Sequence, residues 1–179
     1  MSYRLFIAVF LDKEVKNVLQ KLQEQLRAQS YKGSFTRPEN LHLTLAFLGE
    51  TPENSIKTLH TIIQEIKTPA FELAINRTGC FTHSKKELWW AGVDLNDPKL
   101  SLIKSLHGQL INRLEEEGFP VDKRPFNAHI SLGREIRHSE PIELECPRVR
   151  LKVDRISLVK SERINGVLTY TEIFAQELS

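Results

Sequence analysis

The chain has 179 residues, of which 40% are hydrophobic and 27% are charged, and its formal net charge at pH 7 is +2. This length suits a single domain, covering residues 1–179, with a sizeable hydrophobic core. So small a net charge argues against a protein that coats nucleic acid over its whole surface. The two cysteines, Cys80 and Cys146, share no metal-binding or redox spacing, which favours a reducing, cytoplasmic location.

The first part of the chain predicts a strand followed by two helices. The apolar run 5–11 is too short to span a bilayer and has no cleavage site, so it predicts a strand and no membrane association. Asp12 is expected to cap a helix that carries its apolar residues on one face and ends at Gly33. A second helix is expected to begin with Thr51 as its N-cap and to stop before Pro69.

The remainder predicts mostly strands. Segments 71–81 and 87–94 are expected to form a hairpin, and a third helix is expected from Asp97 to Gly118. After the second histidine motif, we expect a loop at 134–140 and three strands at 148–153, 155–160 and 168–176. Because strands and helices alternate without a regular parallel period, we expect an α+β fold with mainly antiparallel sheets and helices on their outer faces.

Two short segments repeat one pattern, a histidine followed two residues later by a hydroxyl: His42-Leu43-Thr44-Leu45 and His129-Ile130-Ser131-Leu132. Because side chains alternate between the faces of a strand, each histidine shares a face with its hydroxyl. The residues on the opposite, apolar faces are expected to pack inward: Leu41, Leu43, Leu45 and Phe47 in the first segment, and Phe126, Ala128, Ile130 and Leu132 in the second. The small residues Ala46 and Gly133, on the histidine faces, are expected to leave room for a ligand against the sheet.

The two histidines suit acid–base catalysis at a phosphodiester. They lie 87 residues apart, nearly half the chain, as expected if two similar halves each supply one histidine to a shared cleft. One neutral imidazole can accept a proton from the attacking group while the other, protonated, supplies one to the leaving oxygen. Thr44, Ser131 and nearby arginines would hold the phosphate oxygens. Four basic residues near the motifs could form a local basic cleft: Arg37, Lys123, Arg124 and Arg134.

Metal binding is the main alternative chemistry for the two histidines, since imidazole is a common zinc ligand. The pattern offers only two histidines, and no further His, Cys or carboxylate lies at i+2 or i+4 from either one. Threonine and serine are weak zinc ligands. Ser131 also lacks the G-x-S-x-G turn of a serine nucleophile. We therefore expect neither a metal nor a cofactor.

Longer segments around both motifs resemble those of a known family. They are 4–9 (RLFIAV), 37–50 (RPENLHLTLAFLGE), 80–81 (CF) with 88–93 (LWWAGV), and 124–134 (RPFNAHISLGR). The chain is similar over essentially its full length to the RNA 2′,3′-cyclic phosphodiesterases, also called the 2′-5′ RNA ligase family. This family belongs to the two-histidine phosphoesterase superfamily and carries the pattern HXTX twice.

The resemblance implies two similar lobes related by a pseudo-two-fold axis around a central cleft. It implies hydrolysis of RNA 2′,3′-cyclic phosphate ends to 2′-phosphomonoesters. His42 would be the proton donor to the 3′ oxygen and His129 the base that activates water. Thr44 and Ser131 would bind the phosphate, aided by Arg134. Four positions depart from the family's commoner residues, namely Phe35 (Trp), Ala128 (Pro), Ser131 (Thr) and Val159 (Tyr).

Three alternative functions stay open at this point. The chain could ligate tRNA halves through a 2′-5′ bond, hydrolyse a small cyclic nucleotide, or bind nucleotide or RNA without turnover. The expected partner is therefore an RNA with a 2′,3′-cyclic phosphate end or a small cyclic nucleotide. No obligate protein partner is evident, and a monomer is expected.

Overall fold

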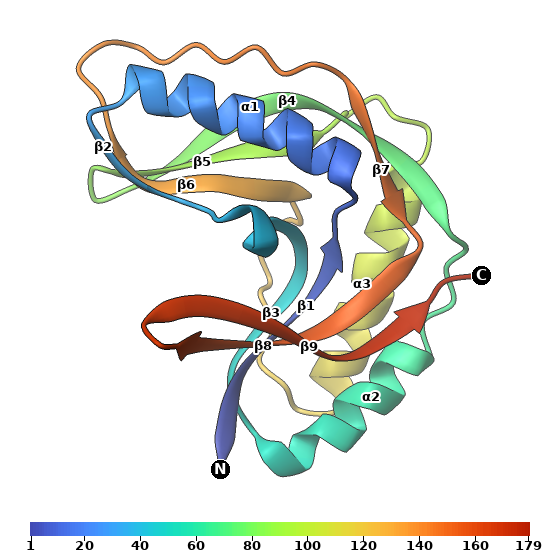
Figure 1. The fold of residues 1–179 in the computed structure, drawn as a ribbon. Helices are drawn as coiled ribbons and strands as arrows, with labels where there is room; N and C mark the ends of the chain where they lie inside the picture. Colours follow the sequence, from blue (N-terminus) through green and yellow to red (C-terminus); the bar gives the residue numbers. More distant parts are fainter.

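Nine strands form one connected, curled sheet in the computed structural model, which describes residues 1–179 (Figure 1). The elements in chain order are β1 (Ser2–Phe10), α1 (Lys13–Gln29), β2 (Lys32–Phe35), η1 (Pro38–Asn40), β3 (His42–Pro52), η2 (Glu53–Ser55), α2 (Ile56–Gln64), β4 (Phe71–His83), β5 (Lys86–Val93), α3 (Leu100–Glu116), β6 (His129–Arg137), β7 (Val149–Val153), β8 (Arg155–Ile164) and β9 (Val167–Glu177). Each strand pair is antiparallel.

The sheet divides into two halves that meet at a narrow seam. Its strand order is β7-β4-β5-β6-β3-β1-β8-β9, and β2 adds to β6. At the seam, β3 and β6 pair only at Leu43 and Ile130. We call the strands β3, β1, β8 and β9 the β3 half, and the strands β6, β5, β4, β7 and β2 the β6 half. The expected α+β fold with two lobes of mainly antiparallel strands is confirmed.

The helices cover the outside of the sheet (Figure 1). Helix α1 follows β1 but packs against β6 and β7 of the other half, whereas α3 packs against β3, and α2 packs against α3, β8 and β9. The predicted cap of α1 is confirmed, because the Asp12 carboxylate accepts a hydrogen bond from the Val15 backbone N–H at 3.0 Å. The chain thus crosses between the halves, and a cluster of 36 buried hydrophobic residues draws on both.

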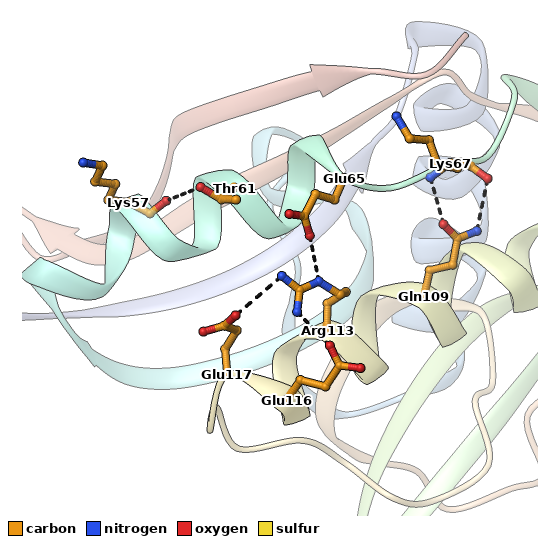
Figure 2. Close-up of polar contacts among 8 residues, drawn as sticks. All are labelled: Lys57, Thr61, Glu65, Lys67, Gln109, Arg113, Glu116 and Glu117. Atoms are coloured by element: carbon orange, nitrogen blue, oxygen red, sulfur yellow. Dashed lines mark hydrogen bonds and ion pairs between the residues drawn. The ribbon is translucent and has the colours of Figure 1, made fainter.

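Helices α2 and α3 are joined by polar contacts on the outer surface (Figure 2). Gln109 on α3 accepts from the Lys67 backbone N–H at 2.8 Å and donates to the Lys67 carbonyl at 3.2 Å. Arg113 pairs with Glu65 at 2.7 Å and also reaches Glu116, the last residue of its own helix, and Glu117 directly after it. Exposed ion pairs add little stability, so these contacts mainly orient α2 against α3. No helix of the protein has the length and apolar character needed to cross a membrane.

Three predicted boundaries are wrong. Helix α1 ends at Gln29, and Gly33 lies within β2, where an added Cβ would be 2.4 Å from Cδ1 of Ile136. Thr51 does not cap a helix, because β3 continues to Pro52 and the buried Thr51 hydroxyl donates to the Gly49 carbonyl at 3.0 Å. The expected loop at 134–140 begins as strand, because β6 pairs with β2 as far as Arg137 and with β5 as far as Ile136.

A β-bulge in β3 changes which side chains face the cleft. Ile7 pairs with Ala46 and Ala8 pairs with Thr44, so Leu45 has no partner on β1. An extra residue in one strand shifts the alternation of side chains beyond it. Leu45 and Ala46 are consequently both buried, and Phe47 is 54% exposed. The predictions that Phe47 packs inward and that Ala46 faces a ligand are wrong.

The prediction that Gly133 leaves room for a ligand is also wrong. Gly133 on β6 pairs with Phe35 on β2. A Cβ added to Gly133 would lie 3.0 Å from Cδ1 of Ile136 and 3.3 Å from Cδ1 of Phe35. These two side chains occupy the space beside the glycine, and the Phe35 side chain lines the cleft itself.

Candidate active site

A cavity of about 890 Å³ lies between the two halves of the sheet. All five side chains that the sequence singled out line it, namely His42, Thr44, His129, Ser131 and Arg134. The seam explains this convergence. Each histidine is the first residue of its strand, and the antiparallel pairing of Leu43 with Ile130 places His42 opposite Ser131 and Thr44 opposite His129. The two motifs therefore form a compact group on one face of the sheet.

Hydrogen bonds orient the ring of His42. Its Nδ1 lies 2.7 Å from the backbone carbonyl oxygen of Asn40, and its Nε2 lies 2.8 Å from the Thr44 hydroxyl. Because a carbonyl only accepts, Nδ1 carries the proton and Nε2 is the nitrogen available for proton transfer. The Asn40 side chain donates to the Leu168 carbonyl at 3.0 Å. The turn that holds His42 is therefore tied to β9.

His129 has the same arrangement in the other half. Its Nδ1 lies 2.6 Å from the Asn127 carbonyl oxygen, so the ring has the same tautomer and its Nε2 is also available. Arg77 on β4 donates to the Asn127 side chain at 3.2 Å and to the Val93 carbonyl at 2.8 Å. Arg77 thus anchors the segment that orients His129.

Aromatic side chains pack against both imidazoles in a similar way. Phe6 and Tyr170 have ring centroids 4.8 and 5.3 Å from that of His42. Phe81 and Trp90 have ring centroids 5.2 and 6.0 Å from that of His129. Each histidine is therefore fixed by its backbone hydrogen bond and by two aromatic rings.

Burial lowers the pKa of both histidines below the ordinary value of 6.5. For His42, the bond to Asn40 opposes this effect, and the positive charges of Arg134 and His129 lower the pKa further. For His129, the bond to Asn127 opposes it and the charge of Arg77 lowers the pKa further. Near neutral pH both rings therefore favour the uncharged form.

The cavity is positively charged. No aspartate or glutamate lines it, while four arginines do, namely Arg4, Arg37, Arg134 and Arg163. Arg37 and Arg134 were anticipated from their closeness to the motifs. Lys123 and Arg124 are not among the residues that line it; they pair instead with Glu115 and Asp122. This excess of positive charge suits an anionic ligand.

Several site residues were not predicted from the sequence. Strand pairing brings five of them to the cavity, namely Arg4, Phe6, Phe47, Tyr170 and Arg163. Phe47 lies on the opposite face from the predicted one, and the other four lie far from the motifs in sequence. One signal was available for Arg4 and Phe6. They are two residues apart in β1, so they share a face of that strand, and β1 pairs with the strand that begins at His42.

Gln23 is a further unanticipated residue, because it lies on the apolar face of α1. Its buried amide donates to the Thr36 carbonyl at 2.7 Å and to the Leu132 carbonyl at 2.9 Å. The Thr36 hydroxyl in turn donates to the Ser131 carbonyl at 3.0 Å. This contact joins the segment before the first motif to the strand of the second.

The side chains of the cavity do not resemble a metal centre. No group of three or more His, Cys, Asp or Glu side chains lies close enough together to hold a metal ion. The polar groups that surround the two histidines are hydroxyls and guanidinium groups, which bind the oxygens of an anion. The arrangement is suited to proton transfer at a bound phosphate ester.

Comparison with known proteins agrees with this geometry. A model of the LigT-like phosphoesterases matches residues 9–90. The RNA 2′,3′-cyclic phosphodiesterase of Escherichia coli K12 is 31% identical over 178 residues, covering 95% of this chain and 93% of the relative. The protein of the same name from Thermotoga maritima is 28% identical over 166 residues, covering 88% of this chain and 86% of the relative.

Solved structures show the same fold. Ligand-free E. coli LigT superposes with a TM-score of 0.82 at 26% identity, covering 99% of this chain and 98% of that one. The fold and the family matches define a phosphoesterase. The chain belongs to the LigT-like phosphoesterase family, together with the E. coli RNA 2′,3′-cyclic phosphodiesterase.

Proposed function

We propose that the chain hydrolyses RNA 2′,3′-cyclic phosphate ends to 2′-phosphomonoesters by acid–base catalysis without a metal. The observation that carries the proposal is the pair of imidazoles from β3 and β6 that face one cavity with their Nδ1 atoms hydrogen-bonded to backbone carbonyls. Two histidines with available Nε2 atoms meet the needs of an in-line displacement at phosphorus. The names of the relatives from E. coli and T. maritima support the substrate class.

His129 acts as the base in this mechanism. Its Nε2 accepts a proton from a water molecule as the water oxygen forms a bond to phosphorus. The lowered pKa of His129 keeps the ring uncharged and ready to accept that proton. The bond from phosphorus to the 3′ oxygen breaks on the opposite side, so the phosphate stays on the 2′ oxygen.

His42 acts as the acid. In its protonated form, Nε2–H donates to the Thr44 hydroxyl, which leaves the Thr44 proton free to contact a phosphate oxygen. The 3′ oxygen takes the His42 proton as it leaves. A bound phosphate anion favours the protonated ring, which offsets the effect of Arg134 on its pKa. Ser131 and Arg134 hold the remaining charge on the phosphate oxygens.

The proposal also covers the organisation of the protein. We propose that residues 1–179 act as one bilobal, cytoplasmic domain that works as a monomer on RNA. The core shared by both halves supports the single domain, because neither half could bury its apolar face alone.

Turnover of a short RNA with a 2′,3′-cyclic phosphate end tests the proposal. The expected product carries only a 2′-phosphate, and its rate of formation is unchanged by EDTA. His42→Ala and His129→Ala should each reduce kcat by at least about 10²-fold, the scale of one positioned proton transfer. His83→Ala, at an exposed position on the β4–β5 hairpin, is the matched control and should retain full activity.

Three results would contradict the proposal. They are a rate abolished reversibly by EDTA, an unchanged rate in both histidine variants, and a product with a 3′-phosphate. Adding an RNA with a free 5′ hydroxyl tests ligation in the same reaction. A nucleoside 2′,3′-cyclic phosphate tests the use of small substrates.

A further inference from the structure

Phe47 and Arg4 form an exposed pair in the cavity, beyond the proposed catalytic group. The Phe47 side chain is 54% exposed, and the Arg4 guanidinium carbon lies 4.9 Å from its ring centroid. The bulge at Leu45 is the reason that Phe47 faces the cavity instead of the core. A single exposed aromatic ring is common on protein surfaces, so its meaning depends on what surrounds it.

The position of the pair follows from the register of β1 and β8. Phe6 contacts the His42 ring, and Arg4 lies two residues further along the same face of β1, about 6.6 Å away at the rise of a strand. Arg4 pairs with Ser161, and Arg163 follows two residues later on the same face of β8. Arg4 therefore lies nearer to His42, and Arg163 lies further out in the same direction.

Neither arginine forms an ion pair, although Glu50 on β3 lies opposite Arg4 in the strand register. No carboxylate lines the cavity that they share with the histidines. Arg163 donates to the Gly166 carbonyl at 3.0 Å, which leaves its charge free for a ligand. An adjoining cavity of about 500 Å³, also lined by Arg4 and Arg163, contains two carboxylates. Of these, Glu162 is paired with Lys160 at 2.8 Å and Glu50 accepts from the Ser2 hydroxyl at 3.1 Å.

An exposed aromatic ring beside a groove of arginines is the combination that binds single-stranded nucleic acid, through base stacking and phosphate contacts. The cyclic phosphate itself is served by the two histidines, the two hydroxyls and Arg134. We infer that Phe47, Arg4 and Arg163 form a second subsite for the nucleotide on the 5′ side of the cyclic end. Its base stacks on Phe47, and the internucleotide phosphate contacts the two arginines.

This inference rests on the proposed function and adds a preference to it. An oligonucleotide fills both subsites, whereas a nucleoside 2′,3′-cyclic phosphate fills only the first. The chain should therefore bind the oligonucleotide more tightly, and the difference should decrease with added salt as phosphate contacts weaken.

The test measures binding without turnover. Fluorescence anisotropy of a 5′-labelled tetranucleotide with a 2′,3′-cyclic phosphate end is recorded on the His42→Ala/His129→Ala double variant. Unlabelled nucleoside 2′,3′-cyclic phosphate, used as a competitor, reports the first subsite. In this background, Phe47→Ala should weaken oligonucleotide binding by about tenfold or more, and Phe47→Trp should restore it.

The arginines are tested by salt dependence. Arg4→Gln and Arg163→Gln should each lower the slope of log Kd against log salt by about 0.7, the value for one lost phosphate contact on a single strand. Arg124→Gln, which replaces an exposed arginine paired with Asp122, is the matched control and should leave the slope unchanged.

The competitor separates this subsite from the first one. The affinity for the competitor should change by less than about twofold in Phe47→Ala, Arg4→Gln and Arg163→Gln. Loss of one stacked base would instead weaken binding by about tenfold. Equal losses for competitor and oligonucleotide would overturn the inference, because Phe47 would then hold the terminal nucleotide. Unchanged oligonucleotide binding would also overturn it. If the wild type hydrolyses no cyclic phosphate, the proposed function fails, while the binding data still decide whether the second subsite exists.

Discussion

Gly79→Ala should disturb the packing that holds His129 in place. Gly79 on β4 pairs with Trp90 on β5, and the indole ring lies directly over the glycine. A Cβ added at Gly79 would lie 2.2 Å from Cζ2 of Trp90, 2.5 Å from Cη2 and 2.7 Å from Cε2. Tight Cβ contacts begin near 3.4 Å, so the ring must shift by about 1.2 Å.

The shift has little free space to use. Trp90 is only 6% exposed, and its ring centroid lies 5.4 Å from that of Phe81 and 6.0 Å from that of His129. On another side, the Arg77 guanidinium carbon is 4.9 Å from the ring centroid. Overpacking of this kind typically lowers the free energy of unfolding by about 1–3 kcal/mol. For a protein of this size, that corresponds to a fall in Tm of roughly 2–12 °C.

Activity should fall as well, because a displacement of about 1 Å near reacting groups can cost about 10²-fold in rate. The assays are urea unfolding and kcat/KM on an RNA with a 2′,3′-cyclic phosphate end. Gly108→Ala is the matched control: no atom lies within 4 Å of its added Cβ. It lies inside α3, where the change should stabilise the protein by up to about 1 kcal/mol.

A double variant tests the cause. Trp90→Phe removes the part of the ring that meets the added methyl, so Gly79→Ala should cost less in the Trp90→Phe background than in the wild type. The reasoning is refuted if Gly79→Ala unfolds at the wild-type urea concentration and keeps full activity. It is also refuted if the costs of the two substitutions simply add.

Four further predictions concern protons and internal contacts. Burial lowers the pKa of His42 and His129 below 6.5, so the optimum of kcat/KM should lie on the acid side of 6.5. Because these two pKa values are lower in the folded protein, His42 and His129 bind more protons in the unfolded chain just below pH 6.5. The free energy of unfolding should therefore decrease as the pH falls through this value. Urea titrations at pH 7.5 and pH 5.5 check the sign. Arg77→Gln removes a charge that lowers the pKa of His129, so the acid limb of the pH–rate profile should move to higher pH; an unmoved limb would contradict this role. Gln23→Leu removes the amide donor from the Thr36 carbonyl, while the Leu132 carbonyl keeps its bond from the Thr36 backbone N–H, and it should cost about 1–3 kcal/mol in urea unfolding. Gln25→Leu, which loses only solvent-exposed bonds to the Glu145 backbone, should cost less.

Local patterns predicted much of the fold correctly. The Asp12 cap, the β4–β5 hairpin and the turn at Asn165-Gly166 each depend on residues that are neighbours in the chain. Both residues of that turn have positive φ, at 52° and 79°, as their types favour. The alternation around His42 and His129 also placed each histidine on the same face as its hydroxyl.

The errors arose where a distant segment decides the local structure. The local pattern predicts a helix end at Gly33, but this glycine allows the close approach of Ile136, more than 100 residues later. The strand β6 extends to Arg137 because β2 and β5 supply partners on both sides. The bulge at Leu45 depends on the register against β1, and strict alternation within β3 cannot reveal it.

Residue type and short spacing were enough to predict the two His-x-hydroxyl strands, the α+β fold class and the family resemblance. The presence of Arg4 and Arg163 in the cleft, and the exposure of Phe47 within it, depend on how the strands pair. Arg4 and Arg163 are brought to the histidines by pairing between strands distant in the chain, whereas Lys123 and Arg124, close to the second motif in sequence, pair with carboxylates elsewhere. The physical reason is that the face a side chain takes is set by cross-strand register, which is a property of the assembled sheet.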